Sequence, residues 1–136
     1  MNDAMQRQVG GAHYKDMKIE PFEFGTANNY DPATFSVMKY ITRHRGKNGL
    51  EDLNKAIHIV DIRVAMFVRY GLPRDATDTI SVKAYISEND IQKPEARALL
   101  YLHLWACWAS AKTFIADADH LKSLLEEIAT TYKEES

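Results

Sequence analysis

The stretch LEDLNKAIHIVDIRVAMFVRY, residues 50–70, decides the fold of this chain, and Gly71 and Pro73 come just after it. Its apolar residues recur at alternating spacings of four and three, which is typical of one face of an α-helix. Glycine followed by proline is a common end to a helix. The pattern predicts a long amphipathic helix over residues 50–70. Its apolar face consists of Leu53, Ile57, Val60, Val64 and Phe67.

A second apolar strip runs beside the first on the same predicted helix and contains Ile59, Ile62 and Met66. One antiparallel neighbour cannot cover two strips at once. Either the C-terminal half of the chain covers the second strip, or another subunit does. We therefore expect a homo-oligomer larger than a dimer.

The rest of the chain also shows helical patterns, and no two-residue alternation is long enough to predict a sheet. Asp31 and Pro32 are a typical helix start, because Asp accepts hydrogen bonds from first-turn amides and Pro needs no amide partner there. The sequence predicts an all-α fold, a small helical bundle with an irregular N-terminal arm over residues 1–20. Phe22 and Phe24 are expected to point inward. The expected helices besides 50–70 are 21–29, 32–44, 80–88, 94–114 and 117–133.

The length of 136 residues fits one compact domain or a small domain with a helical appendage. Residues 72–79 are the best linker candidate, so we divide the chain into a helical domain, 1–72, and a C-terminal helical region, 73–136. The longest nearly apolar run, residues 98–111, is too short to span a bilayer. A single cysteine, Cys107, excludes an internal disulfide framework, and its apolar surroundings favour a core thiol over a nucleophile.

The charge is uneven along the chain. Residues 1–72 carry 10 Lys+Arg and 8 Asp+Glu, whereas residues 73–136 carry 7 and 11. Neither balance is that of a protein that binds duplex nucleic acid. A stretch without acids, residues 32–50, nevertheless contains the cations Lys39, Arg43, Arg45 and Lys47. A basic patch of this size suits a few phosphates.

The candidate site is built around this patch. Ser36, Lys39 and Arg43 share one face of the predicted helix, and the loop after it adds Arg45 and Lys47 between two glycines. The next helix opens with Glu51 and Asp52 and continues with Lys55 and His58. Read one by one, these residues also fit two capped amphipathic helices joined by a solvated basic turn. No GxxxxGK[ST], GxGxxG, CxxC or HExxH motif is present.

Two stretches together form a pattern that is more specific than the single residues within it. They are GGAHYKDMKIEPFEF, residues 10–24, and VMKYITRHRGKNGLEDLNKAIHIV, residues 37–60. Their order and spacing resemble the small bacteriophage family of P-loop-less nucleotide kinases, over about residues 9–70. The hallmark residues that carry the resemblance are His13, Tyr14, Pro21, Lys39, Tyr40, Arg43, Lys47, Gly49, Glu51, Asp52, Lys55 and Ala56.

The resemblance implies phosphoryl transfer from a nucleoside triphosphate to a deoxynucleoside monophosphate, in the host cytoplasm. Catalysis would fall to Lys39, Arg43, Glu51 and Asp52, because phosphoryl transfer requires positioning and neutralised charge. Glu51 or Asp52 would hold Mg²⁺ or, as the safer role, orient Lys55 and Arg43; no resident metal is expected. The residues that would bind substrate or phosphate are His13, Tyr14, Ser36, Tyr40, Arg45, Lys47 and Lys55.

The chain departs from the family pattern at Glu20, at Phe35-Ser36 and at Ile59, where the family usually has Gln, Gly-Asn and Tyr. These departures leave two other functions open. One is a non-catalytic nucleotide sponge that sequesters a host defence signal. The other is an inhibitor that docks on a host protein through residues 73–136, which hold both tryptophans. Replacing Arg43 or Lys47 by Ala is expected to weaken nucleotide binding and to change the melting temperature little.

Overall fold

The computed structural model describes residues 17–135, with side chains to residue 133, and over this range it is all-α without a strand. The predicted all-α helical bundle is confirmed. A short 3₁₀ helix, η2, His44–Gly46, follows the second helix. The helices are α1 Pro21–Ala27, α2 Pro32–Arg43, α3 Leu50–Tyr70, α4 Val82–Glu88, α5 Lys93–Cys107 and α6 Phe114–Glu135.

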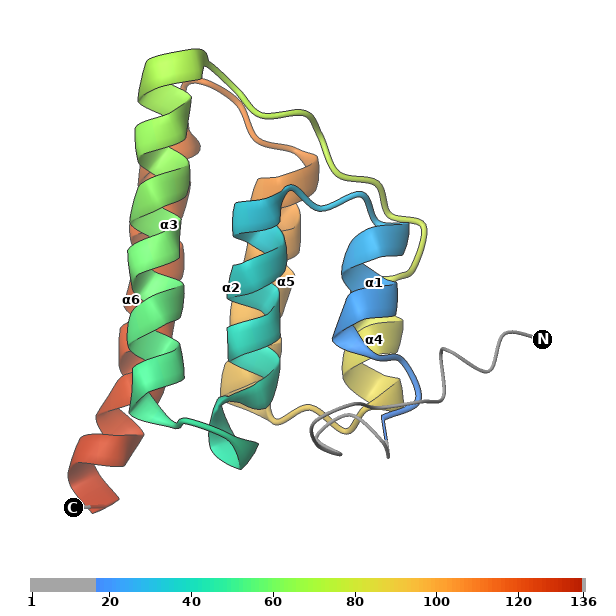
Figure 1. Cartoon of the computed structure of the whole chain (residues 1–136), viewed down its shortest axis with the longest axis vertical. Helices are drawn as coiled ribbons and strands as arrows, with labels where there is room; N and C mark the ends of the chain where they lie inside the picture. The colour runs from blue at the N-terminus through green and yellow to red at the C-terminus, as the bar shows by residue number, and fades with distance from the viewer. Residues whose placement is uncertain (1–16, 136) are drawn as a thin grey trace.

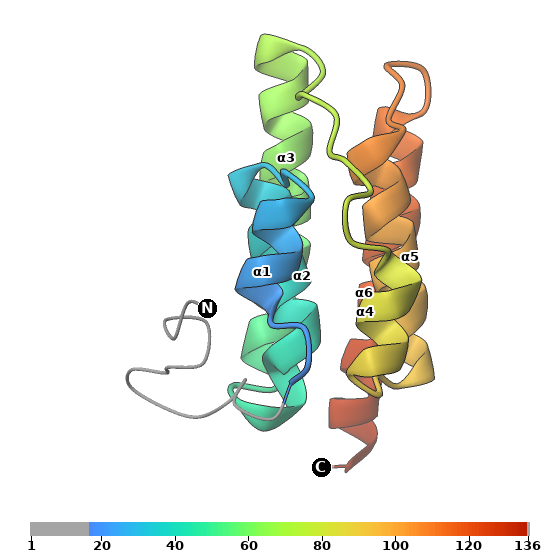
Figure 2. The ribbon, with the colours of Figure 1, turned by 90° about the vertical axis from the view of Figure 1, so that its right-hand side faces the viewer.

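The helices form two layers (Figures 1 and 2). One layer contains α1, α2 and α3, and the other contains α4, α5 and α6. Across the layers α2 packs on α5 and α3 packs on α6, while α2 and α3 pack closely within their layer. Within the described residues, 17–72 and 73–135 form two layers that share one interior.

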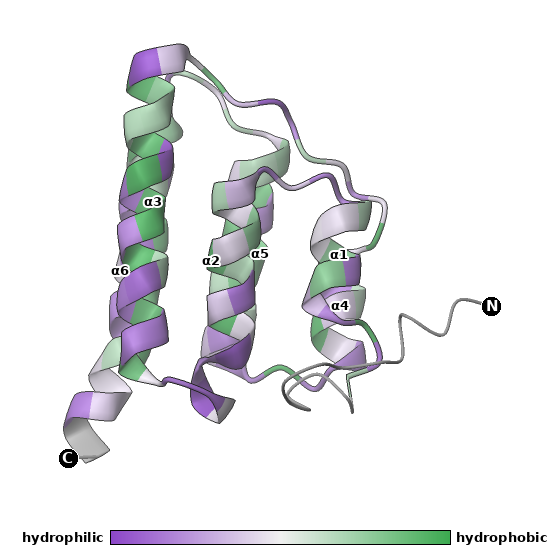
Figure 3. Ribbon diagram, viewed as in Figure 1, coloured by the Kyte–Doolittle hydropathy of each residue, from purple (hydrophilic) through white to green (hydrophobic). Residues whose placement is uncertain are grey.

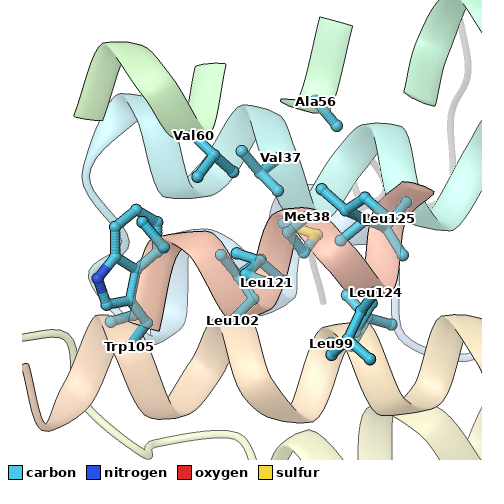
Figure 4. Packing of buried hydrophobic residues seen from close by; sticks show 14 of the residues in the cluster. Val37, Met38, Ala56, Val60, Leu99, Leu102, Trp105, Leu121, Leu124 and Leu125 are labelled. Carbon is cyan, nitrogen blue, oxygen red and sulfur yellow. The ribbon is translucent and has the colours of Figure 1, made fainter. Parts of the chain in front are cut away.

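The core lies between the layers and draws side chains from both (Figure 4). The predicted inward residues of the last helix, Leu121, Leu124, Leu125 and Ile128, are all buried. Phe24 is also buried, and its ring stacks on Tyr85 of α4 at 4.3 Å between centroids. The prediction for Phe22 was wrong, because the residue is 68% exposed, with its ring in a T-shaped arrangement with the Phe35 ring.

Local chemistry explains where α2 and α3 begin and end. Asp31 Oδ1 accepts a hydrogen bond from the Thr34 amide at 2.9 Å, and Pro32 occupies the first turn of α2. α3 begins after Gly49 and ends just before Gly71, and these glycines have positive φ angles of 56° and 89°. Such backbone conformations are costly for residues with a Cβ atom, so these glycines fix both ends of α3.

The boundary between α5 and α6 differs from the prediction. α5 ends at Cys107, seven residues before the expected end, and α6 begins at Phe114. The Thr113 amide donates to the carbonyl of Ser110 at 3.2 Å, and their hydroxyls are 2.8 Å apart. This serine–threonine turn lies within an apolar stretch and breaks the helix without glycine or proline.

The second apolar strip of α3 is not covered by the C-terminal half. Ile59 is half-buried, whereas Ile62 and Met66 are 42% and 51% exposed. Figure 3 shows the upper half of α3 as largely hydrophobic and the lower ends of α2 and α3, with the turn between them, as largely hydrophilic. None of the helices within residues 17–135 has the length and apolar character needed to cross a membrane.

Candidate functional site

Three cations surround one aromatic ring where α2 approaches α3. The Lys39 Nζ, the Arg43 Cζ and the Lys55 Nζ lie 5.7, 4.8 and 5.9 Å from the centroid of the Tyr40 ring. We call these four residues the Tyr40 cluster. The electron-rich ring face attracts each cation and holds positive charges near one another. Two helices thereby concentrate charge that the sequence spreads over 17 positions.

The members of the Tyr40 cluster differ in how far their charge is neutralised. No acidic side chain within residues 17–135 pairs with Lys39. Lys55 forms a surface ion pair with Glu51 at 3.6 Å, one turn earlier on α3, and such a pair stabilises little. Lys39 and Lys55 therefore have the charge best suited to an incoming anion.

Arg43 instead has a structural partner. Its Nε donates to Asp52 Oδ2 at 3.3 Å and its Nη2 to Oδ1 at 3.4 Å. The Asp52 carboxylate is fully buried and also accepts from the Asn48 backbone amide at 3.4 Å. Asp52 thus ties the end of α2 to the turn before α3. That the acids orient Arg43 and Lys55 stays a prediction.

The donor set does not fit a resident Mg²⁺ site. Both Asp52 oxygens already accept hydrogen bonds, and Glu51 pairs with Lys55. Within residues 17–135 no group of three His, Cys, Asp or Glu side chains is placed to hold a metal ion. Mg²⁺ bound by proteins usually needs one or two free carboxylates in addition to substrate phosphates.

Arg45 does not belong to the Tyr40 cluster. Its side chain pairs with Glu95 of α5 instead. Its Nε donates to Glu95 Oε2 at 2.8 Å, and the same oxygen lies 2.7 Å from His44 Nε2. Burial alone would raise the pKa of the Glu95 carboxyl, but the hydrogen bond with His44, the backbone hydrogen bond and the charge of Arg45 outweigh it and lower that pKa. Arg45, His44 and Glu95 line a separate hollow of about 270 Å³.

The remaining predicted residues are dispersed. Lys47 is exposed in the turn before α3. Ser36 lies about two turns before Arg43 and lines an apolar hollow of about 490 Å³ between α2 and the second half of α3. Ile59 lines the same hollow, so two of the positions that depart from the resembled family pattern meet there. His13 and Tyr14 lie outside the described residues.

Two important residues escaped the sequence analysis. Glu95 pairs with Arg45 across 50 positions, and Arg63 is 3% exposed and donates through Nη2 to Asp31 Oδ2 at 3.0 Å. The helical pattern gave a signal for Arg63, because Arg63 continues the buried positions Ala56 and Val60 along α3. Glu95 gave only the weak signal of an acid in a first turn.

Cys107 has the environment expected of a core thiol. Burial, together with the nearby charges of Asp78 and Asp75, raises its pKa to about 11. His103 Nε2 lies 3.4 Å from Sγ but also 2.9 Å from Asp78 Oδ1, while His103 Nδ1 faces the Tyr30 hydroxyl. A nucleophile–base pair requires an imidazole nitrogen that serves the thiol alone, so this contact does not form a catalytic triad.

Residues 9–61 match the model of a protein family described as a protein of unknown function, DUF3310. The matched segment includes the Tyr40 cluster, Glu51 and Asp52, and it ends before Arg63 and before every helix of the second layer. No curated protein and no solved structure matched the chain.

Proposed function

We propose that this protein binds a nucleotide through its phosphates at the Tyr40 cluster and transfers a phosphoryl group from a nucleoside triphosphate to a deoxynucleoside monophosphate. The supporting observation is the convergence of Lys39, Arg43 and Lys55 on one ring, with Lys39 free of acidic partners among the described residues. Clustered cations neutralise the charge that two sets of phosphates bring together, which is the main demand of phosphoryl transfer.

Each residue has a distinct part in this proposal. Lys39 and Lys55 contact phosphate oxygens as mobile point charges. Asp52 positions Arg43 rather than touching substrate, and Glu51 keeps Lys55 near the ring. Any Mg²⁺ would arrive with the nucleotide phosphates, since Arg43 engages the buried Asp52 carboxylate and Glu51 alone does not make a metal site. Lys47 in the exposed turn adds charge at the edge of the site.

The engaged Asp52 carboxylate favours one alternative, a nucleotide sponge without turnover. A sponge needs the cations but no free acid, and the buried Asp52 carboxylate is already taken up by Arg43. In this version the protein, as a phage product in the host cytoplasm, would sequester a signalling nucleotide and leave it intact. The two versions share the binding site and differ only in the product.

The experiment is a thermal-shift panel of nucleotides followed by analysis of the products. Wild type is expected to melt at a higher temperature with a nucleotide present, and Lys39→Ala is expected to lose that shift. Lys83→Ala, which changes an exposed lysine on α4, is the matched control and should keep it. Conversion of dTMP or dGMP to the diphosphate supports the kinase, and release of intact nucleotide supports the sponge. No shift with any nucleotide refutes both.

We also propose self-association through the α5 stripe, an apolar surface formed by Leu100 and Leu104 on α5 and by Trp108 just after it. Ile62 and Met66 on α3 line the hollow between α2 and α3 instead. An assembly larger than a dimer stays a prediction from the sequence. Light scattering at micromolar concentration tests it, and a monomer would contradict it.

The α5 stripe is also the surface that a host-protein inhibitor would use. Of the two tryptophans, only Trp108 is exposed, because Trp105 is fully buried. If the stripe binds a host protein, Trp108→Ala abolishes capture of that protein and leaves the mass of the assembly unchanged. If it joins subunits, the same substitution lowers the mass.

A further inference from the structure

The apolar hollow beside the Tyr40 cluster has the size and lining of a small-molecule site. Its volume of about 490 Å³ falls within the range of pockets that bind drug-sized ligands. Pro32 and Ala33 of α2 form one wall, and Ile59, Ile62 and Met66 of α3 form the other. A flat apolar ring fits such a slot better than a charged group does.

One buried polar group in the lining has a donor left over. Arg63 lines the hollow with its side chain 3% exposed, and it donates to Asp31 through Nε and Nη2. Its Nη1 is buried and has no hydrogen-bond partner. The guanidinium packs over the Trp105 and Phe114 rings, 4.3 and 5.1 Å from their centroids. Arg63 therefore adds a fixed positive charge to a mostly apolar lining.

The hollow and the Tyr40 cluster follow one another along the same pair of helices. On α2, Ser36 lines the hollow and Lys39 lies three residues on, a rise of about 5 Å. On α3, Ile59 lines the hollow and Lys55 lies four residues back, about 6 Å along the axis. An elongated ligand with an anionic end and an aromatic end can therefore reach both.

We propose that this hollow is the subsite for the base of the bound nucleotide, with the ring packed between the apolar walls of α2 and α3. The inference rests on the proposed function, since the phosphates must sit at the Tyr40 cluster. It adds the direction in which the nucleotide lies, with its base toward Met66 and its phosphates toward Arg43.

The test narrows the hollow without touching the cations. Ala33→Phe places a ring in the space between α2 and α3, and Ala116→Phe, at an exposed position near the start of α6, is the matched control. Calorimetry compares a deoxynucleoside monophosphate with deoxyribose 5-phosphate, which has no base. In wild type and in Ala116→Phe the base should raise affinity by about tenfold or more. In Ala33→Phe the ratio of the two affinities should fall to near one, while deoxyribose 5-phosphate still binds.

The outcomes separate the two proposals. If Lys39→Ala abolishes nucleotide binding but Ala33→Phe keeps the full gain from the base, the Tyr40 cluster stands and the base subsite is wrong. If wild type binds neither compound, both proposals fail. If Ala33→Phe lowers the mass of the assembly and leaves the gain unchanged, the hollow holds a second copy, which also overturns the base subsite.

A spectroscopic measurement checks whether the base enters the hollow without changing its lining. The Arg63 guanidinium lies 4.3 Å from the Trp105 ring centroid, and Trp108→Phe leaves Trp105 as the only tryptophan. A nucleotide in the hollow should change the Trp105 emission at saturation, whereas saturating deoxyribose 5-phosphate should not. Equal effects of the two compounds would contradict the subsite.

Discussion

The Asp52 carboxylate is fully buried, and Arg43, on the preceding helix, is its cationic partner at 3.3 Å. A cation selected as a phosphate ligand is therefore also a structural group. Removing it leaves a buried negative charge with only Asn48 as a hydrogen-bond donor among the contacts described.

We predict that Arg43→Ala lowers the free energy of unfolding by about 2–4 kcal/mol, because breaking a buried pair strands one charge. This replaces the expectation that melting changes little. Urea unfolding measures the effect. Adding Asp52→Asn to Arg43→Ala should recover part of the loss, and Lys47→Ala should cost little because Lys47 is exposed. A stable Arg43→Ala protein would contradict this.

Tyr40→Leu should weaken nucleotide binding by about three- to tenfold while the fold is retained. Leucine keeps apolar bulk but removes the ring face that attracts three cations, each contact contributing about 0.5–1 kcal/mol at exposed sites. Calorimetry gives the affinity and far-ultraviolet circular dichroism checks the fold. Tyr40→Phe is the control and should bind like wild type. Equal losses in both variants would assign the effect to the hydroxyl.

Gly49→Ala and Gly46→Ala form a matched pair in the turn between α2 and α3. Gly49 has φ of 56°, and a Cβ there would lie 3.2 Å from the Tyr132 ring, whereas a Cβ at Gly46 meets nothing within 4 Å. Gly49→Ala should destabilise the protein by about 1–3 kcal/mol, and Gly46→Ala should be neutral or slightly stabilising. Thermal melting compares them, and similar melting temperatures would refute the assignment.

Acid should remove the stabilisation that Glu95 provides. Its pKa in the folded protein is below the ordinary value of 4.5, so its contribution is present above that pH and is lost as pH falls through the lower folded pKa. Glu95→Gln should be less stable than wild type at pH 7, and the gap should narrow below about pH 4.5. Urea midpoints from pH 3 to 7 test this, and a constant gap would contradict it.

Cys107 should react slowly with a disulfide reagent in the native protein at pH 7.5. Its pKa of about 11 keeps it protonated, and only 7% of the residue is exposed. Thiolate, not thiol, is the reactive form. Absorbance at the wavelength of the released thiol follows the reaction, with protein in urea as the fully reactive control. Rapid labelling of the native protein would contradict the core assignment.

Sequence periodicity predicted the helices well where glycine, proline or a capping aspartate marks a helix end. Gly49 and Gly71 bound α3, and Asp31 with Pro32 opens α2, so these helices begin as expected. The α5 boundary was missed because the apolar run of residues 98–111 continues past Cys107, where the helix stops. Phe22 was misplaced because a seven-residue helix has too few turns to define a face.

The candidate site was predictable only in part, for a related reason. Spacing along α2 brought Lys39 and Arg43 to one face, and spacing along α3 brought Lys55 near Asp52. Pairings between distant segments, such as Arg45 with Glu95 and Arg63 with Asp31, depend on how helices pack. These pairings decide which predicted cations can bind a ligand and which have a structural partner. No local sequence pattern distinguishes the two groups.

The order of the two layers along the chain has a consequence for biosynthesis. The first layer ends at Tyr70, whereas the helices that cover its inner face are α5 and α6, which begin at Lys93 and Phe114. The inner apolar face of the first layer thus stays exposed on the nascent chain until the last third of the message has been translated. Nascent chains stalled in that interval should bind chaperones or aggregate. A gene truncated after residue 70 should yield an insoluble product.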